Sequence, residues 1–71
     1  MKMVEVFKTN ITNQYTAASL TEELQQLFPR AIINFDLDDC DRILRVMGEN
    51  LHAPSIAAHL VRKGHLCEVL E

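Results

Sequence analysis

Glycine, proline and cysteine are scarce in this 71-residue sequence, which contains two of each. Two glycines are too few for a glycine-rich loop that cradles phosphate groups. No apolar run after Lys2 or Lys8 is long enough for a signal peptide or a membrane span, so we expect a cytoplasmic protein without a membrane partner. Seven Lys and Arg against ten Asp and Glu give a net charge of −3, which argues against a nucleic acid partner.

The remaining composition is that of an ordinary globular protein, with 48% apolar and 24% charged residues. No repeat, linker or low-complexity segment interrupts the chain, which predicts one domain over residues 1–71. A domain of this size buries a smaller fraction of its surface than a larger domain does, so its core provides only marginal stability. Assembly with a partner would add stability.

Two apolar spacings alternate along the chain. A spacing of two, with β-branched and large apolar residues, predicts strands at residues 2–8, 32–37, 43–47 and 66–70. Helical spacing predicts helices over residues 14–28 and from about 52–54 to 64. The order strand, helix, strand, strand, helix, strand predicts an α+β, ferredoxin-like βαββαβ sandwich, with a four-stranded antiparallel sheet of order 4-1-3-2 and two helices on one face.

The helix ends follow from capping residues. Asn13 is a suitable N-cap for the first helix, and Pro29 stops that helix after Phe28. Ser19 with Glu22 forms a competing capping box, which would start the helix later, but Ala17 extends the apolar stripe back and favours the longer helix. For the second helix, proline in the first turn and Gly64 after the last turn predict the two ends.

Alternation along the strands assigns the two faces of the sheet. The residues expected in the core are Val4, Val6, Ile11, Leu20, Leu24, Leu27, Ile33, Phe35, Leu37, Leu44, Val46, Ile56, Leu60, Cys67 and Val69. Seven large apolar residues are expected on the other face, namely Met3, Phe7, Ile32, Ile43, Met47, Leu66 and Leu70. An exposed patch of that size marks an interface, so this face is predicted to contact a second copy of the chain or another protein.

The two cysteines are expected to be free thiols. In the predicted strand order, the turn that contains Cys40 lies about 2.5 strand spacings of ~4.8 Å from the strand that contains Cys67, or roughly 12 Å. A disulfide tolerates a Cα separation of only about 7 Å. Cys67 is expected to be buried with a raised pKa, and Cys40 to be exposed, so neither is predicted to be catalytic.

Three segments and one corner are similar to a known family. Phe7–Ile11, Asn34–Leu37, Asp41–Val46 and the corner Lys63-Gly64-His65 resemble heavy-metal-associated domains, the soft-metal modules of copper chaperones and metal-transporting ATPases. The resemblance covers nearly the whole chain and implies the ferredoxin-like fold, together with docking of other small domains.

The metal-binding motif of that family, Cys-x-x-Cys in the first loop, is absent. Asn13 and Thr16 occupy the two cysteine positions, and neither offers the soft thiolate that selects Cu(I) or Zn(II). The resemblance therefore implies the scaffold without the metal. With no Ser/His/Asp set either, the sequence predicts a non-enzymatic protein-interaction module, self-associating and without a cofactor.

Two other functions stay open. In the predicted topology one end of the sheet gathers Asn13, Asp38, Asp39, Cys40, Asp41 and His65, which could bind Zn(II) or a harder cation, although no recognised ligand spacing is present. The same element order is shared by ACT domains, which would imply a small-molecule sensor.

His52 and His59 lie two helical turns apart and are both expected to point to solvent.

Overall fold

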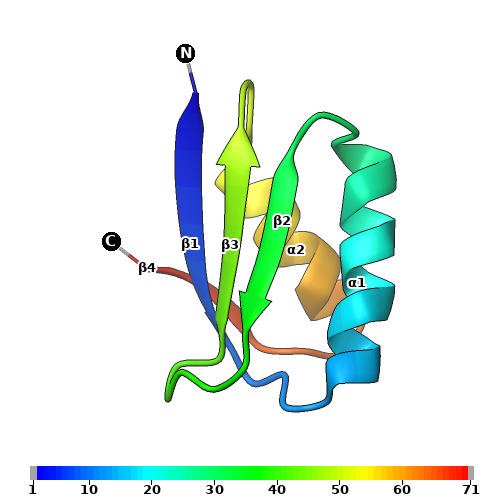
Figure 1. Ribbon diagram of the computed structural model, residues 1–71, viewed down its shortest axis with the longest axis vertical. Helices are drawn as coiled ribbons and strands as arrows, with labels where there is room; N and C mark the ends of the chain where they lie inside the picture. Colours follow the sequence, from blue (N-terminus) through cyan, green and yellow to red (C-terminus); the bar gives the residue numbers. More distant parts are fainter. Residues whose placement is uncertain (1, 71) are drawn as a thin grey trace.

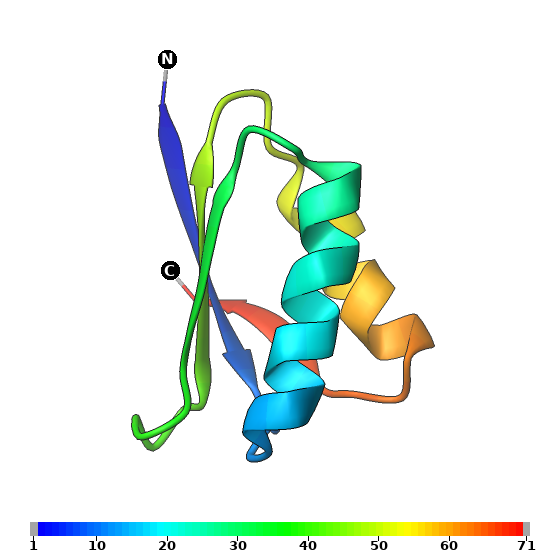
Figure 2. The ribbon, with the colours of Figure 1, turned by 45° about the vertical axis from the view of Figure 1, so that its right-hand side comes forward.

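The computed structural model describes residues 2–70, so both end residues of the predicted domain lie outside the described part. The elements in chain order are β1 (Met3–Thr9), α1 (Gln14–Leu27), β2 (Ile32–Asp36), β3 (Ile43–Gly48), α2 (Ala53–Arg62) and β4 (Cys67–Leu70). The strands form one antiparallel sheet of order β2-β3-β1-β4, with β1, β3 and β2 side by side in Figure 1. Figure 2 shows the sheet nearly edge-on with both helices on one side. The predicted α+β, ferredoxin-like fold is confirmed.

Capping determines where α1 begins. The Asn13 side chain accepts hydrogen bonds from the backbone N–H groups of Tyr15 at 2.7 Å and Thr16 at 3.3 Å, so two of the free donors of the first turn are satisfied. The competing start at Ser19 is wrong, because Ser19 lies inside the helix. At the other end the helix stops at Leu27, with Phe28 as C-cap before Pro29.

The ends of α2 also follow from the sequence. Pro54 occupies the first turn, where its missing N–H removes no helical hydrogen bond. Gly64 follows the helix with φ of +92°, a conformation that glycine adopts without strain. His65 N–H then donates to the Leu60 carbonyl at 3.0 Å, which turns the chain toward β4.

The faces of β1 are the reverse of the prediction. Phe7 pairs with Leu44 and both are 0% exposed beneath the helices, whereas Val4 is 54% exposed on the opposite face. Val6 shares that face with Val4. Both alternate sets of β1 are apolar, so spacing alone does not choose between them. The helices shelter only one face, and burying a phenyl ring there removes more apolar area from water than burying a valine.

The core lies between the sheet and the helices. Eight predicted core residues are buried, namely Ile11, Leu20, Leu24, Leu44, Val46, Ile56, Leu60 and Cys67, and three others, Ile33, Phe35 and Leu37, are partly buried against them. Val4, Leu27 and Val69 are exposed, and Val6 faces away from the helices, so these four predictions are wrong. Leu27 lies in the last turn of α1, and Val69 lies on the edge strand β4. Ala31 and Leu51 are buried although they were not predicted to be.

Neither helix found within residues 2–70 has the length and apolar character needed to cross a membrane.

Candidate functional site

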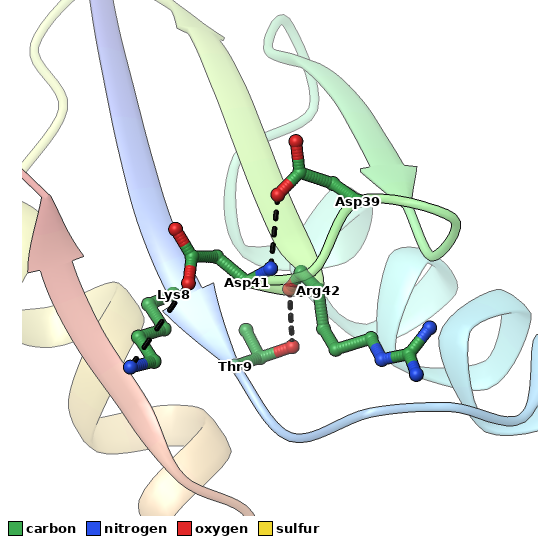
Figure 3. Close-up of polar contacts among 5 residues, drawn as sticks. All are labelled: Lys8, Thr9, Asp39, Asp41 and Arg42. Carbon is green, nitrogen blue, oxygen red and sulfur yellow. Dashed lines mark hydrogen bonds and ion pairs between the residues drawn. The ribbon is translucent and has the colours of Figure 1, made fainter.

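The hydroxyl of Thr9 anchors the turn between β2 and β3. Thr9 is 3% exposed, and its Oγ1 donates to the Arg42 carbonyl at 2.5 Å and accepts from the Ile11 N–H at 3.2 Å. The Thr9 N–H donates to the Asp41 carbonyl at 3.1 Å, and Figure 3 shows the bond from Oγ1 to the Arg42 carbonyl. One buried residue therefore joins the end of β1 to the loop that follows it and to the turn between the next two strands.

This turn, residues 38–41, is called the acidic turn below. The Asp39 carboxylate accepts a hydrogen bond from the Asp41 N–H at 2.9 Å (Figure 3), and the Asp39 carbonyl accepts from the Arg42 N–H at 3.0 Å. The Arg42 guanidinium donates to the Leu37 carbonyl. Arg42 adopts φ of +47°, which is uncommon for a residue with a side chain, and these hydrogen bonds hold it there.

The acidic turn brings three donor groups together. One ligand atom from each of Asp39, Cys40 and Asp41 lies within 4.8 Å of the other two. Lys8 Nζ lies 4.0 Å from the Asp41 carboxylate (Figure 3), and both side chains are about half exposed. The ammonium group of Lys8 thus compensates part of the negative charge of Asp41, which would otherwise attract a bound cation.

The other predicted ligands do not join this group. Within residues 2–70 the donor cluster includes neither Asp38 nor His65, and the Asn13 amide oxygen is engaged as the cap of α1. His65 instead lines a shallow groove that also contains Thr16, one of the two positions where the heavy-metal-associated family has cysteine. The acidic turn therefore offers a cation three consecutive residues and no histidine, although structural zinc sites use four ligands.

The thiols differ in environment, as predicted. Both cysteines are free, with Cys40 exposed on the acidic turn and Cys67 buried. Burial raises the pKa of the Cys67 thiol to about 11, and the neighbouring Glu68 carboxylate contributes in the same direction. Cys67 stays protonated near neutral pH and is a poor nucleophile or metal ligand.

The side of the sheet away from the helices is called the open face below. Strand register places three cross-strand rows on it: Val4, Met47 and Ile32; then Val6, Leu70, Arg45 and Asn34; then Lys8, Glu68, Ile43 and Asp36. The first row is entirely apolar, and the third contains three of the four charged residues. The open face therefore changes from apolar to charged along the strands.

The predicted interface residues separate into two groups. Ile32, Ile43, Met47 and Leu70 lie on the open face, although Ile43 is only 7% exposed between its row neighbours. Phe7 lies in the core, and Met3 pairs with Gly48 on the helix side of the sheet, so these two assignments are wrong because the faces of β1 are reversed. Val4 and Val6 take their places. Leu66 is 40% exposed and precedes β4, where its N–H donates to the Asn10 side chain at 3.0 Å.

An ion-pair bridge between the helices was not predicted. His59 Nε2 lies 2.7 Å from a Glu23 carboxylate oxygen, and Lys63 Nζ lies 3.5 Å from the same oxygen. The hydrogen bond with His59 lowers the pKa of Glu23, and Lys63 acts in the same direction. His59 is therefore not directed to solvent, whereas His52 is exposed and contacts Ser55 Oγ at 2.7 Å. The four-residue spacing of His59 and Lys63 places them on one side of α2, which is the signal that could have indicated a shared partner.

The sequence matches no family model, and comparison with curated proteins and with solved structures returns no match.

Proposed function

We propose that this chain is a non-enzymatic protein-interaction module that self-associates through its open face. The observation that carries the proposal is the apolar row of Val4, Met47 and Ile32 on a sheet face that no helix covers (Figure 2). Val4 is 54% and Ile32 55% exposed, and Leu70 adds 36% exposure in the next row. In the monomer these side chains are in contact with water. Burying them against a second apolar surface is therefore favourable and stabilises the dimer.

The charges of the open face favour a second copy as the partner. Lys8 and Arg45 contribute two positive charges, and Asp36 and Glu68 contribute two negative charges, so the face is neutral although the chain has a net charge of −3. In a dimer with two-fold symmetry, the same surface meets itself. A neutral face of mixed sign can pair its charges across such an axis, whereas a face of one sign would repel its copy.

The size of the open face indicates a weak dimer. Four strands about 4.8 Å apart and five residues at about 3.3 Å each cover roughly 300 Å² before side-chain relief is added. Stable complexes bury about 800 Å² per partner, so an interface limited to this face belongs to the weak, transient class.

Sedimentation equilibrium over a concentration series tests the proposal. We expect the average mass to rise from 8.1 kDa toward twice that value between about 5 and about 500 µM. Ile32→Lys places a charge in the apolar row and should keep the chain monomeric throughout. Val61→Lys on α2 is the matched control, because Val61 is 56% exposed and lies in the other layer. A wild-type mass of 8.1 kDa over the whole series would remove self-association, as would equal association of both variants.

Metal analysis separates this proposal from the cation-binding alternative. Elemental analysis of protein purified without chelator should find no stoichiometric zinc or copper, because the acidic turn supplies only Asp39, Cys40 and Asp41 and part of its charge is compensated by Lys8. One equivalent of metal, lost on Cys40→Ser, would replace the proposal with metal binding. A co-purifying amino acid would favour the ACT-like sensor. The resemblance to heavy-metal-associated domains and a cytoplasmic location stay predictions.

A further inference from the structure

A groove separates the C-terminal end of α1 from α2, on the opposite side of the molecule from the open face. Its cavity measures about 420 Å³, and it is lined chiefly by Leu27, Phe28, His52, Pro54, Ala58 and Arg62. We call it the helix groove. None of its lining residues belongs to the open face or to the acidic turn, so an occupant would leave both of those regions free.

The lining of the helix groove is mainly apolar. Leu27 is 56% exposed, an unusual position for leucine in a helix that buries Leu20 and Leu24, and Phe28 packs partly against the core beneath. At the two helix ends that border the groove, the Phe28 carbonyl accepts from the Ala31 N–H and the His52 carbonyl accepts from the Ser55 and Ile56 N–H groups. Recognition at this site therefore depends on side chains, through apolar contact and charge.

Among the described residues that line the helix groove, the charged side chain is Arg62. Arg62 forms no hydrogen bond or ion pair within residues 2–70, and His52 uses only Nδ1, in its contact with Ser55. No carboxylate of residues 2–70 lines the helix groove, although the chain contains ten acidic residues against seven basic ones. Glu23 lies one helical turn before Leu27, but His59 and Lys63 already pair with it. An apolar groove with an unpaired cation on an otherwise acidic protein is complementary to an apolar surface that carries negative charge.

We propose that the helix groove binds an acidic amphipathic helix of a partner protein. One apolar side chain of that helix packs between Leu27 and Ala58, and a carboxylate on its flank pairs with Arg62. An amphipathic helix fits a groove between two helices because its own backbone hydrogen bonds are satisfied and its apolar side chains recur on one face. The charge of Arg62 then selects acidic over basic helices.

The test uses two synthetic peptides of about 14 residues, long enough for a few helical turns. Both carry leucines at positions i, i+3, i+4 and i+7, and they differ only in having glutamate or lysine at the flanking positions. Fluorescence anisotropy measures binding, and amide NMR shifts of the full chain locate it. The acidic peptide should bind with a dissociation constant below about 1 mM, weaken in about 0.5 M salt, and shift the amides around Leu27, Ala58 and Arg62.

Three variants separate recognition from folding. Arg62→Glu should lower the affinity for the acidic peptide at least about tenfold and raise the affinity for the basic peptide. General destabilisation of the fold cannot produce such a reversal. Leu27→Ser should weaken both peptides. Val61→Ser is the matched control, since Val61 is also 56% exposed and is not part of the groove lining, and should leave binding unchanged. Equal binding of the two peptides to the wild type, no binding at 1 mM, or shifts confined to the open face would overturn the proposal.

Discussion

Thr9 is a small residue whose hydrogen bonds connect separate segments of the chain. It is the one polar residue among the buried residues of the described part of the chain, and its side chain links β1 to the loop at Ile11 and to Arg42, the residue after the acidic turn, through two hydrogen bonds. A buried carbonyl or N–H that loses its partner carries a desolvation cost of about 1–3 kcal/mol. The Arg42 carbonyl accepts from the Thr9 hydroxyl, so this bond adds to the hydrogen bonds within the turn that hold Arg42 at φ of +47°.

Replacing the Thr9 hydroxyl by a methyl group tests that link. We expect Thr9→Val to lower the free energy of unfolding by about 1–3 kcal/mol, because the Arg42 carbonyl and the Ile11 N–H lose a partner while the side-chain volume is kept. Urea denaturation measures the change, and Thr12→Val on the exposed loop is the control. A loss no larger than that of the control would show that the hydroxyl does not hold the turn.

The reversed faces of β1 show what strand alternation can and cannot predict. The sequence correctly predicted a strand at residues 2–8 and its antiparallel neighbours, because β-branched and apolar residues at a spacing of two are specific for an extended chain. It did not predict the face, because Phe7 and Val6 give the same pattern and differ only in how much area each buries. That choice depends on the helices that cover the sheet, which the strand sequence does not contain.

Alanine substitution on the two faces of β1 checks this correction. Phe7→Ala should cost about 3–5 kcal/mol or unfold the chain, since Phe7 is 0% exposed and its loss leaves a cavity. Val4→Ala should cost less than about 0.5 kcal/mol in dilute solution, since Val4 is 54% exposed. Thermal or urea unfolding of both variants gives the comparison. A larger loss for Val4 than for Phe7 would return β1 to the orientation first predicted.

Element boundaries were the most predictable part of the structure. Asn13, Pro29 and Gly64 each act through local backbone chemistry, and the observed ends of α1 and α2 agree with them. The contact between the two helices was not predictable in the same way. Glu23 and His59 are 36 residues apart in sequence, and only the packing of both helices on one sheet face brings them to 2.7 Å. For the same reason His65 could not be placed relative to the acidic turn.

The ion-pair bridge of Glu23 with His59 and Lys63 should make the free energy of unfolding depend on pH. The pKa of Glu23 is lowered in the folded chain from 4.5, chiefly by His59, so its contribution is present above about pH 4.5 and is lost as pH falls through the lowered pKa. Glu23→Gln should therefore lose less stability than the wild type between about pH 5 and pH 3. Urea midpoints across that range measure the effect, with the exposed neighbour Glu22→Gln as control. Parallel pH profiles for Glu23→Gln and the wild type would count against the bridge.

At the scale of the whole molecule, residues 2–70 form one sheet and one helix layer, and neither helix covers the second face of the sheet (Figures 1 and 2). The mixed charge and apolar row of that face form the basis for the proposed self-association. The scaffold was predictable from the sequence, whereas the composition of the open face depended on the orientation of β1. The correction exchanges Met3 and Phe7 for Val4 and Val6, and an apolar surface remains.

Dilution of isotope-labelled protein, followed by amide NMR shifts, tests the self-association most directly. From about 1 mM to about 20 µM, we expect concentration-dependent shifts at the open-face positions Val4, Val6, Ile32 and Met47, and none at Leu27, Ala58 or Arg62 on the helix groove. The same shifts should be absent from Ile32→Lys. Shifts that cluster on the helices, or a spectrum that stays constant over the whole range, would contradict an interface on the open face.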